Sequence, residues 1–276
     1  MERQVISMKH HIRNTFIWLV ATLGIVRLYR KEVRKKGPLV RVLVFHDIHD
    51  REWFELMVET LCEHFYVISP DDFHARKFDQ ERVNILVTFD DGYASWESAV
   101  LSVLEENGIK GLFFANSALL DIAHDSAGAN VFMREQLLIR PRAPLTWEGL
   151  QKLKDKGHTI GGHTCTHSNL ATLHGEDLIR EIRDDKHAIE RMLGITLTDF
   201  AYPFGTRWHV SDEAREAVIA AGYGHVYTTI SGFADPHETF SIPRLCIETG
   251  TTPKKLKRWV LGGYDLFERL KRLCVQ

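Results

Sequence analysis

The sequence contains few cysteines. Four occur in 276 residues, Cys62, Cys165, Cys246 and Cys274, and they are scattered, without a Cys-x-x-Cys pair. They form no dense disulfide framework, so they neither require an oxidising compartment nor exclude one.

The sequence also lacks a long hydrophobic run. Residues 15–26 are nearly all apolar, but Arg27 ends the run, and a membrane span needs about 20 such residues. The run has the length of a signal-peptide core, yet no small-residue cleavage site follows it. We expect residues 1–38 to form an amphipathic helix at a membrane interface, with its basic side chains reaching the lipid phosphates. A helix docked on the protein itself is the alternative.

The net charge of the chain is small, but its charges are unevenly distributed along the sequence. The formal net charge is only -2, yet residues 1–38 carry nine Lys/Arg against Glu2 and Glu32, a local +7. Residues 252–276 carry a local +5, which leaves -14 for the middle. Basic ends on an acidic body favour an anionic membrane surface as a partner, and solvated basic tails are the alternative. We therefore expect membrane association rather than a freely cytoplasmic protein, and no nucleic-acid partner.

The pattern of strands and helices predicts an α/β fold. The chain is 44% hydrophobic and 26% charged, without internal repeats or low-complexity tracts, and its length suits one large barrel domain. Apolar runs alternate with helical spacing, which favours parallel β/α packing. The expected strands are 39–45, 83–89, 109–115, a strand leading into 161–162, 199–204, 226–229 and 242–247. The expected helices are 53–65, 96–104, 147–156 with Thr146 as N-cap, 175–193, 211–221 and 253–273.

Residues 116–145 interrupt this alternation. The stretch mixes Gly, Ala, Asp, His and Pro around a short apolar run at Phe132, and is interpreted as an irregular insertion. Long irregular insertions in compact domains are often functional loops, so we expect this one to shape a substrate groove.

Two adjacent carboxylates, Asp90 and Asp91, follow the apolar strand 83–89. Burying like charges this close is costly unless a cation binds or the two side chains take different roles. Neighbours in a strand point to opposite sides, so the two need not act together. A polar turn in which Asp91 caps the next helix is the alternative.

Two histidines, His163 and His167, follow Gly161-Gly162 at the end of another expected strand. Histidines four residues apart can reach one metal, and Asp91 could complete a set of three ligands that leaves a position open for water. In a parallel β/α fold both groups would lie at the carboxyl ends of strands, where active sites assemble. The chain has 15 His, so a chance pair is the alternative.

Residues 200–205, Phe-Ala-Tyr-Pro-Phe-Gly, form a third feature. Pro and Gly around aromatics predict a rigid loop whose backbone N–H groups could face an oxyanion, although an ordinary turn has the same composition.

Together these segments resemble the polysaccharide deacetylase family (carbohydrate esterase family 4, the NodB-homology domain). The resemblance covers residues 39–250 and rests on TFDDGY at 88–93, HTCTH at 163–167 and AYPFG at 201–205. It implies a distorted (β/α) barrel that removes N-acetyl groups from amino sugars with a divalent metal. It also implies that Asp91, His163 and His167 are the metal ligands and that Asp90 is the base that deprotonates the attacking water.

The sequence departs from the family pattern in two places. An arginine that often holds the catalytic base is replaced by Ala201, and we expect Arg244 to supply that charge from a neighbouring strand. The late strand ending in a histidine is also missing, but Val42–Phe45 followed by His46 is an equivalent near the start. This resembles the circularly permuted branch of the family, which acts on exopolysaccharide glucosamine polymers, and makes His46 the expected general acid. A structural histidine at a strand end is the alternative.

The resulting hypothesis is a metal-dependent hydrolase that deacetylates a polysaccharide or a lipid-linked glycan. Zinc is the expected metal, with cobalt, nickel or iron as alternatives. Tyr93, Tyr202 and Phe204 are the expected substrate and oxyanion contacts. The expected organisation is an N-terminal helix (1–38), the deacetylase domain (39–251) and a basic amphipathic C-terminal helix (252–276). A hydrolase of a small amide or formamide, a catalytically inactive carbohydrate-binding relative and a magnesium phosphatase-like site are the alternatives.

Overall fold

The computed structural model describes residues 13–20 and 22–273. The part of the expected N-terminal helix in residues 1–12, like residues 274–276 of the expected C-terminal helix, lies outside the described residues. The strands are β1 (Val40–Phe45), β2 (Tyr66–Val67), β3 (Asn84–Asp91), β4 (Leu112–Ala115), β5 (Thr159–Gly162), β6 (Asp199–Ala201), β7 (His225–Tyr227) and β8 (Arg244–Cys246).

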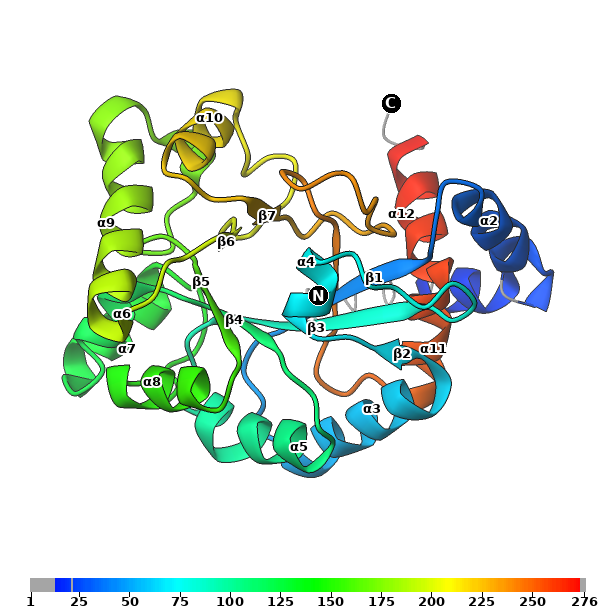
Figure 1. The fold of residues 1–276 in the computed structure, drawn as a ribbon, viewed down its shortest axis with the longest axis horizontal. Coiled ribbons are helices and arrows are strands. Elements are labelled where there is room, and N and C mark those ends of the chain that lie inside the picture. Colours follow the sequence, from blue (N-terminus) through cyan, green and yellow to red (C-terminus); the bar gives the residue numbers. More distant parts are fainter. Residues whose placement is uncertain (1–12, 21, 274–276) are drawn as a thin grey trace, which may run out of the picture.

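All strand pairs are parallel, in the order β7-β6-β5-β4-β3-β1-β8, and β2 pairs with the start of β3. An isolated parallel bridge between Tyr227 and Ile242 joins β7 to the segment that enters β8. The sheet is thereby a nearly closed barrel with helices around it, as Figure 1 shows. The predicted distorted (β/α) barrel is confirmed.

Helices surround the outside of the barrel, and one short helix covers an end of it. They are α2 (Ile25–Arg34), α3 (Arg51–His64), α4 (Pro70–His74), the π-helix η1 (Trp96–Val100), α5 (Leu101–Glu106), α6 (Ser117–Asp121), α7 (Ser126–Glu135), α8 (Trp147–Asp155), the 3₁₀ turn η2 (Leu170–Thr172), α9 (Gly175–Leu193), α10 (Asp212–Ala220), α11 (Pro253–Arg258), the π-helix η3 (Trp259–Gly263) and α12 (Tyr264–Leu273). Residues 13–20 are also helical. Thr146 caps α8 as expected, by accepting a hydrogen bond from the Gly149 N–H.

The interpretation of residues 116–145 as irregular is wrong for much of that stretch. α6 and α7 lie within it, and the Asp125 side chain caps α7 by accepting from the Ala127 N–H. The predicted C-terminal helix is interrupted at Gly262, whose φ of 105° is left-handed.

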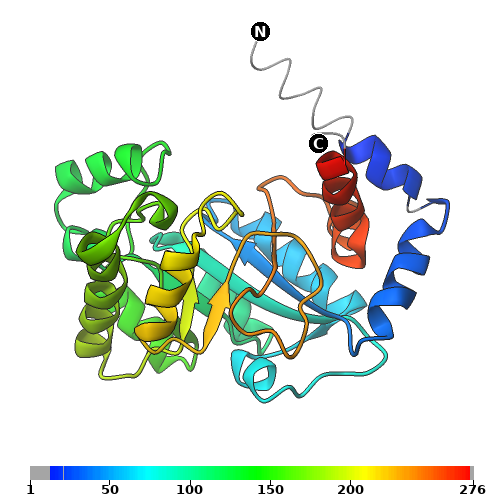
Figure 2. The same ribbon diagram turned by 90° about the horizontal axis from the view of Figure 1, so that it is seen from above.

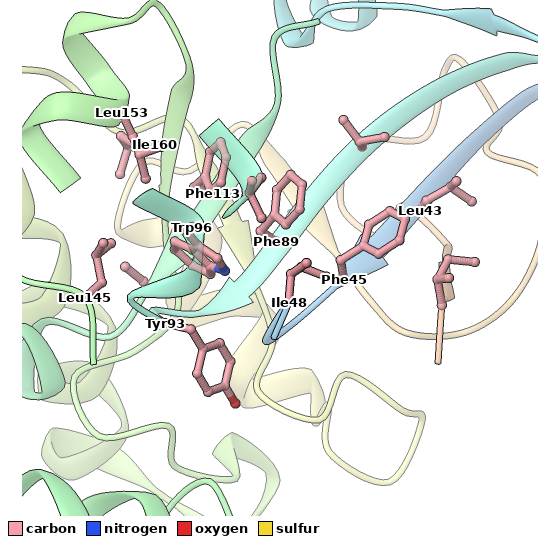
Figure 3. Packing of buried hydrophobic residues seen from close by; sticks show 14 of the residues in the cluster. Leu43, Phe45, Ile48, Phe89, Tyr93, Trp96, Phe113, Leu145, Leu153 and Ile160 are labelled. Carbon is pink, nitrogen blue, oxygen red and sulfur yellow. The ribbon is translucent and has the colours of Figure 1, made fainter. Parts of the chain in front are cut away.

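Alternate residues of the strands face two different cores. Phe45, Phe89 and Phe113 face outward and pack under the helices (Figure 3). The Phe89 and Phe113 rings are stacked, with their centroids 4.6 Å apart. A second set of side chains, which includes Val42, Leu86 and Phe114, faces inward and fills the barrel. This period of two puts Asp90 on the inner face of β3, in step with Leu86.

Both ends of the described chain pack on the same side of the barrel. In Figure 2 the blue N-terminal helices lie beside the red α12, and the Phe16 and Phe267 rings are 5.9 Å apart. Ile17, Val20 and Val26 are buried, so one face of the N-terminal segment docks on the protein. The opposite face exposes Trp18 and Leu28, among others.

Candidate active site

The residues singled out in the sequence come together at the carboxyl ends of the parallel strands. Asp90 and Asp91 are the last two residues of β3, and His163 directly follows β5. β4 lies between β3 and β5 and pairs with both in parallel. The carboxyl ends of β3 and β5 therefore lie close together at one edge of the sheet.

Asp91, His163 and His167 form one compact cluster. The Nε2 atoms of both histidines lie 3.4 Å from Asp91 Oδ1, and all three residues are buried. One ligand atom from each residue falls within 4.8 Å of the others, a spacing suited to a single metal ion.

Neighbouring groups orient each of these side chains. The Nδ1 atom of His163 is 2.7 Å from the Ala201 carbonyl oxygen, and that of His167 is 3.2 Å from the Gln136 carbonyl oxygen. A ring that donates Nδ1–H to a carbonyl presents the lone pair of Nε2, the arrangement typical of histidine ligands. Within the described chain, His163 Nε2 is buried without a hydrogen-bond partner, which a bound cation would provide. The residues present therefore fit a divalent cation.

Electrostatics within the cluster favour an anionic Asp91. Burial alone would raise the pKa of this carboxyl, but the facing His163 and His167 imidazoles hold it well below its usual range. For His167, burial lowers the pKa, while the partner Asp91 outweighs it, so the net direction is upward. The Tyr93 hydroxyl donates to Asp91 Oδ2 at 2.8 Å, and burial beside that charge raises the Tyr93 pKa.

Close packing explains the two glycines before His163. A Cβ on Gly161 would collide with the Phe114 ring, and one on Gly162 would collide with Tyr223 and approach Asp185. The absence of a side chain at both positions allows β5 to lie directly against its neighbours, and this sets the position of His163, the next residue.

Asp185 holds the start of the loop that carries His163 in place. Its carboxylate accepts hydrogen bonds from the backbone N–H groups of Ser117 at 2.9 Å and His163 at 3.0 Å. Burial raises the pKa of Asp185 to about 7. The sequence interpretation missed this residue, although a signal existed: Asp185 lies on the apolar stripe of α9 with Leu178, Ile182 and Ile189.

The backbone is strained around the cluster. Six non-glycine residues of the described chain have positive φ, and four of them, Asp91, Thr164, His167 and Phe204, lie at this site. Such conformations persist only where the surroundings enforce them, and they concentrate at functional sites.

Asp90 faces the barrel interior and binds Arg244. The guanidinium Nη1 and Nη2 atoms each lie 2.6 Å from one Asp90 carboxylate oxygen, in a bidentate ion pair with both residues buried. Arg244 also donates to the Thr228 carbonyl at 3.0 Å and the Thr88 hydroxyl at 3.2 Å, which fixes its position. Arg244 thus reaches Asp90 from β8, where Ala201 cannot.

A cavity of about 530 Å³ opens above these residues. His46, at the end of β1, lines it together with Asp90 and Asp91. Leu137, Ile139, Arg140 and Arg142 form one wall, so the segment after α7 shapes the pocket, as the sequence predicted for this region. Arg142 Nε lies 3.1 Å from an Asp47 carboxylate oxygen and ties this wall to the β1 loop.

The three expected substrate contacts have different positions. Tyr93 and Phe204 line the cavity, and the Phe204 ring lies 4.6 Å from the His167 ring. Tyr202 is in the core against Phe200, and its N–H already donates to the Tyr227 carbonyl. The structure therefore does not bring Tyr202 to the pocket.

A nearly closed parallel barrel with a His₂Asp cluster at its carboxyl end defines the class of protein. The family model described as polysaccharide deacetylase matches residues 77–226, more than half of the chain. The chain belongs to the polysaccharide deacetylase family, whose members are hydrolases of N-acetyl amide bonds in polysaccharides.

Named relatives share part of the chain. The chitin deacetylase of Colletotrichum lindemuthianum is 26% identical over 110 residues, which are 40% of this chain and 37% of that protein. The peptidoglycan-N-acetylglucosamine deacetylase of Bacillus cereus is 24% identical over 144 residues, 52% of this chain and 44% of that protein. The matched region thus spans less than half the length of either relative.

Solved structures share the fold over most of the chain. The Streptococcus pyogenes deacetylase PplD, solved in complex with acetate, superposes with a TM-score of 0.66 at 19% identity, covering 80% of this chain and 97% of that one. IcaB from Ammonifex degensii gives a TM-score of 0.65 at 19% identity, covering 82% and 98%.

Proposed function

We propose that the protein hydrolyses N-acetyl groups of amino sugars in a glycan, releasing acetate and a free amine. The observation that carries the proposal is the Asp90–Arg244 pair directly beside the Asp91–His163–His167 cluster, in a cavity that also exposes His46. Amide hydrolysis needs a base for water, stabilisation of an oxyanion and an acid for the leaving nitrogen, and the cavity offers a candidate for each.

Asp91, His163 and His167 are the residues that would hold a divalent cation. Two imidazoles and one carboxylate suit zinc, and cobalt, nickel or iron can occupy the same donor set. Such an ion supplies Lewis-acid polarisation of the acetamide carbonyl and of water.

Asp90 is the proposed general base. Its pairing with Arg244 orients the carboxylate toward the cavity, and the buried guanidinium compensates its charge. Asp90 removes a proton from the attacking water, whose oxygen forms the new bond to the carbonyl carbon.

His46 is the proposed general acid. It lines the cavity near Asp91, whose pKa its positive charge would lower further. A proton from His46 goes to the departing nitrogen as the C–N bond breaks. The proton that Asp90 took from water replaces the one that His46 has lost.

The backbone N–H of Phe204 is the proposed oxyanion donor. The Tyr202 N–H is bound to the Tyr227 carbonyl, and the Gly205 N–H to the Pro203 carbonyl at 2.6 Å. Among the described residues, the Phe204 N–H donates no such backbone hydrogen bond. Phe204 also has a left-handed φ of 58°, unlike an ordinary loop residue.

We propose a polymer containing N-acetylglucosamine as the substrate rather than a small amide. The named relatives act on chitin and on peptidoglycan N-acetylglucosamine, and the cavity wall includes exposed Arg140 and Arg142, so it reaches the surface. Placement in the circularly permuted branch, and with it an exopolysaccharide substrate, is supported by β1: the strand that leads to His46 precedes the family-matched residues 77–226.

The test is acetate release from N-acetylglucosamine oligomers, with metal content measured on the same samples. Asp90→Asn should lower the rate by about 10²–10⁴-fold while the bound metal stays unchanged. The control is Asp184→Asn on the exposed face of α9, which should keep the wild-type rate. A wild-type rate in Asp90→Asn would overturn its assignment as base, and metal binding without acetate release from any N-acetylated sugar would favour a binding protein.

We further propose that the N-terminal helices lie on an anionic membrane surface. Trp18, Leu19, Leu23, Ile25 and Leu28 are exposed apolar side chains of this segment. Exposed Arg27, Lys31, Lys35 and Lys36 accompany them, which suits an interfacial helix on acidic lipid. Among the described helices, none has the length and apolar character needed to cross a bilayer. A lipid-linked or membrane-proximal glycan would then be within reach of the site.

Co-sedimentation with vesicles tests this surface. The full chain should sediment with phosphatidylglycerol-containing vesicles and not with phosphatidylcholine alone, and Leu28→Glu should weaken the binding. Leu56→Glu, a similarly exposed leucine on α3, is the control and should not change it. Equal binding by both variants, or self-association without lipid that Leu28→Glu abolishes, would overturn the proposal.

A further inference from the structure

A second cluster of potential metal ligands lies away from the active site. His74, Asp199 and His225 each offer one ligand atom, and these atoms lie within 4.8 Å of one another. Asp199 is buried and the two histidines are half-buried. The proposed deacetylase mechanism uses none of the three.

The cluster lies at the opposite end of the barrel. Asp199 and His225 are the first residues of β6 and β7 and face each other in register. The active-site residues, in contrast, follow the carboxyl ends of β3 and β5. His74 comes from α4, which lies over the centre of the ring of strands in Figure 1 and packs Phe73 into the interior core.

The carboxylate at the centre of the cluster is already well supported. Asp199 Oδ1 accepts from the Tyr227 hydroxyl at 2.9 Å and lies 2.9 Å from His74 Nε2, while Oδ2 accepts from the Thr198 hydroxyl at 2.8 Å. Hydrogen bonds of this kind orient metal-binding carboxylates in proteins.

His225 is the residue that an ordinary ion pair does not explain. Its ring stacks on the His74 ring with centroids 4.1 Å apart and an angle of 19° between the planes. Within the described chain its Nδ1 atom is buried and has no hydrogen-bond partner. A buried, unpaired ring nitrogen beside a carboxylate and a second imidazole is an incomplete arrangement that a cation would complete.

We propose that His74, Asp199 and His225 bind a divalent cation, with zinc as the best match to two imidazoles and one carboxylate. Water would complete a four-coordinate site. Binding replaces the His74–Asp199 hydrogen bond, and gives His225 a partner.

The surrounding charges permit this. Burial lowers the pKa of His225, and the neighbouring His74 and Arg76 lower it further, against Asp199, which raises it. Burial lowers the pKa of His74, but Asp199 and Asp71 together raise it by more, so the net direction is upward.

The site would be structural. It would join α4 to the first residues of β6 and β7 and so close the amino-terminal end of the barrel. β6 is only three residues long, and its last residue, Ala201, provides the carbonyl that orients His163. A cation at Asp199 would therefore stiffen the strand that holds one active-site ligand.

Metal stoichiometry tests the proposal without any activity assay. After equilibration of the full chain with buffered zinc and dialysis, elemental analysis should give one equivalent less for His225→Ala than for the wild type. His74→Ala, on a short surface helix, should lose the same equivalent. His237→Ala, an exposed loop histidine, is the matched control and should lose none. The difference is diagnostic whether or not the active site retains its own metal.

Cobalt spectroscopy in a variant without the active-site histidines isolates the second site. With His163→Ala and His167→Ala combined, Co²⁺ should still give the strong visible absorption of a four-coordinate ion, and adding His225→Ala should remove it. Zinc should likewise raise the Tm of the double variant and leave that of the triple variant unchanged. Equal metal content in wild type, His74→Ala and His225→Ala, with no cobalt band in the double variant, would overturn the proposal.

Discussion

The bidentate contact between Arg244 and Asp90 is the most specific interaction at the residue scale. Arg244→Lys keeps the charge but cannot reproduce two parallel hydrogen bonds, so we expect kcat for acetate release to fall by about ten- to a hundredfold. Arg244→Met should lose more, and should also cost about 3–5 kcal/mol of unfolding free energy, because it leaves Asp90 buried and unpaired. Steady-state kinetics and urea unfolding on the two variants measure these effects. Equal activity of the two variants would contradict the orienting role.

The buried His158 predicts a pH dependence of stability. Burial, with Lys110 nearby, lowers its pKa to about 4, against an ordinary value of 6.5, and its Nδ1 accepts from the Gly111 N–H at 3.0 Å. The unfolded chain therefore takes up the proton first, and stability is lost as the pH falls from 6.5 toward 4.

The size of this effect can be isolated by substitution. Between pH 7 and pH 5 we expect His158 to account for a loss of about 1–2 kcal/mol in the free energy of unfolding. Asn at 158 can still accept from the Gly111 N–H but does not titrate. Urea unfolding should show a smaller loss in His158→Asn than in wild type over this interval, and identical losses would contradict the assignment.

Sequence reasoning identified residues where local motifs exist. Asp91, His163 and His167 were predicted from two motifs and a family resemblance, and the structure brings them together. Tyr202 belongs to the same loop as Phe204, yet no sequence pattern tells which aromatic of such a loop turns into the core. The distance between Asp90 and Arg244 along the chain is 154 residues, so only the absence of the expected arginine at Ala201 suggested their pairing.

At the element scale, the short strand β5 depends on its glycines. Gly162→Ala would force a methyl group against the Tyr223 hydroxyl and the Asp185 carboxylate. Overpacking of this kind costs about 1–3 kcal/mol, and because His163 follows directly, metal affinity should fall as well.

A second glycine provides the matched control. Gly224→Ala has only the Thr198 carbonyl oxygen nearby, at 3.9 Å, and should be close to neutral in both measurements. Thermal unfolding and zinc titration of the two variants distinguish them. If Gly162→Ala matched Gly224→Ala, packing against Tyr223 would not be what requires glycine there.

Long amphipathic or apolar elements were predictable, and short ones were not. α9 runs from Gly175 to Leu193, the predicted bounds, because its apolar stripe repeats over five turns. β2 has two residues and α4 five, too few for any period to be visible. α6 and α7 were missed because their small and polar residues hide the helical pattern, although Asp125 is a good cap residue.

On the scale of the whole molecule, Asp265 joins the two ends of the chain to the barrel. It binds Arg41 of β1 through both carboxylate oxygens, at 3.0 and 2.9 Å, and accepts from Tyr29 of α2 at 3.1 Å and from Ser231 at 2.5 Å. Asp265→Ala should lower the free energy of unfolding by about 3–5 kcal/mol, because the buried Arg41 guanidinium is left without its counter-charge.

Two comparisons sharpen this prediction. Glu106→Ala removes the partner of Arg51 in an exposed ion pair and should cost less than about 1 kcal/mol. The double variant Arg41→Met with Asp265→Leu should recover most of the stability lost in Asp265→Ala. Urea unfolding measures all three, and a loss no larger than that of Glu106→Ala would show that the buried pair contributes little.

The barrel as a whole followed from the alternation of strands and helices, but the contacts across it did not. His74, Asp199 and His225 lie up to 151 positions apart by their numbers and share no motif, so only the closed barrel brings them together. The docking of the N-terminal helix on α12 was likewise open in the sequence, where one apolar run served equally for a lipid surface and for a protein core.

The place of Arg244 in the chain has a consequence for the order of assembly. A ribosome makes β1 to β7, with the proposed metal ligands Asp91, His163 and His167, before it reaches β8. The growing polypeptide therefore holds Asp90 without its counter-charge. Only when the last strand adds to β1 does the guanidinium arrive. Closure of the barrel and completion of the proposed Asp90–Arg244 pair are then one event, and a nascent chain stalled before β8 would carry the proposed metal ligands without a paired base.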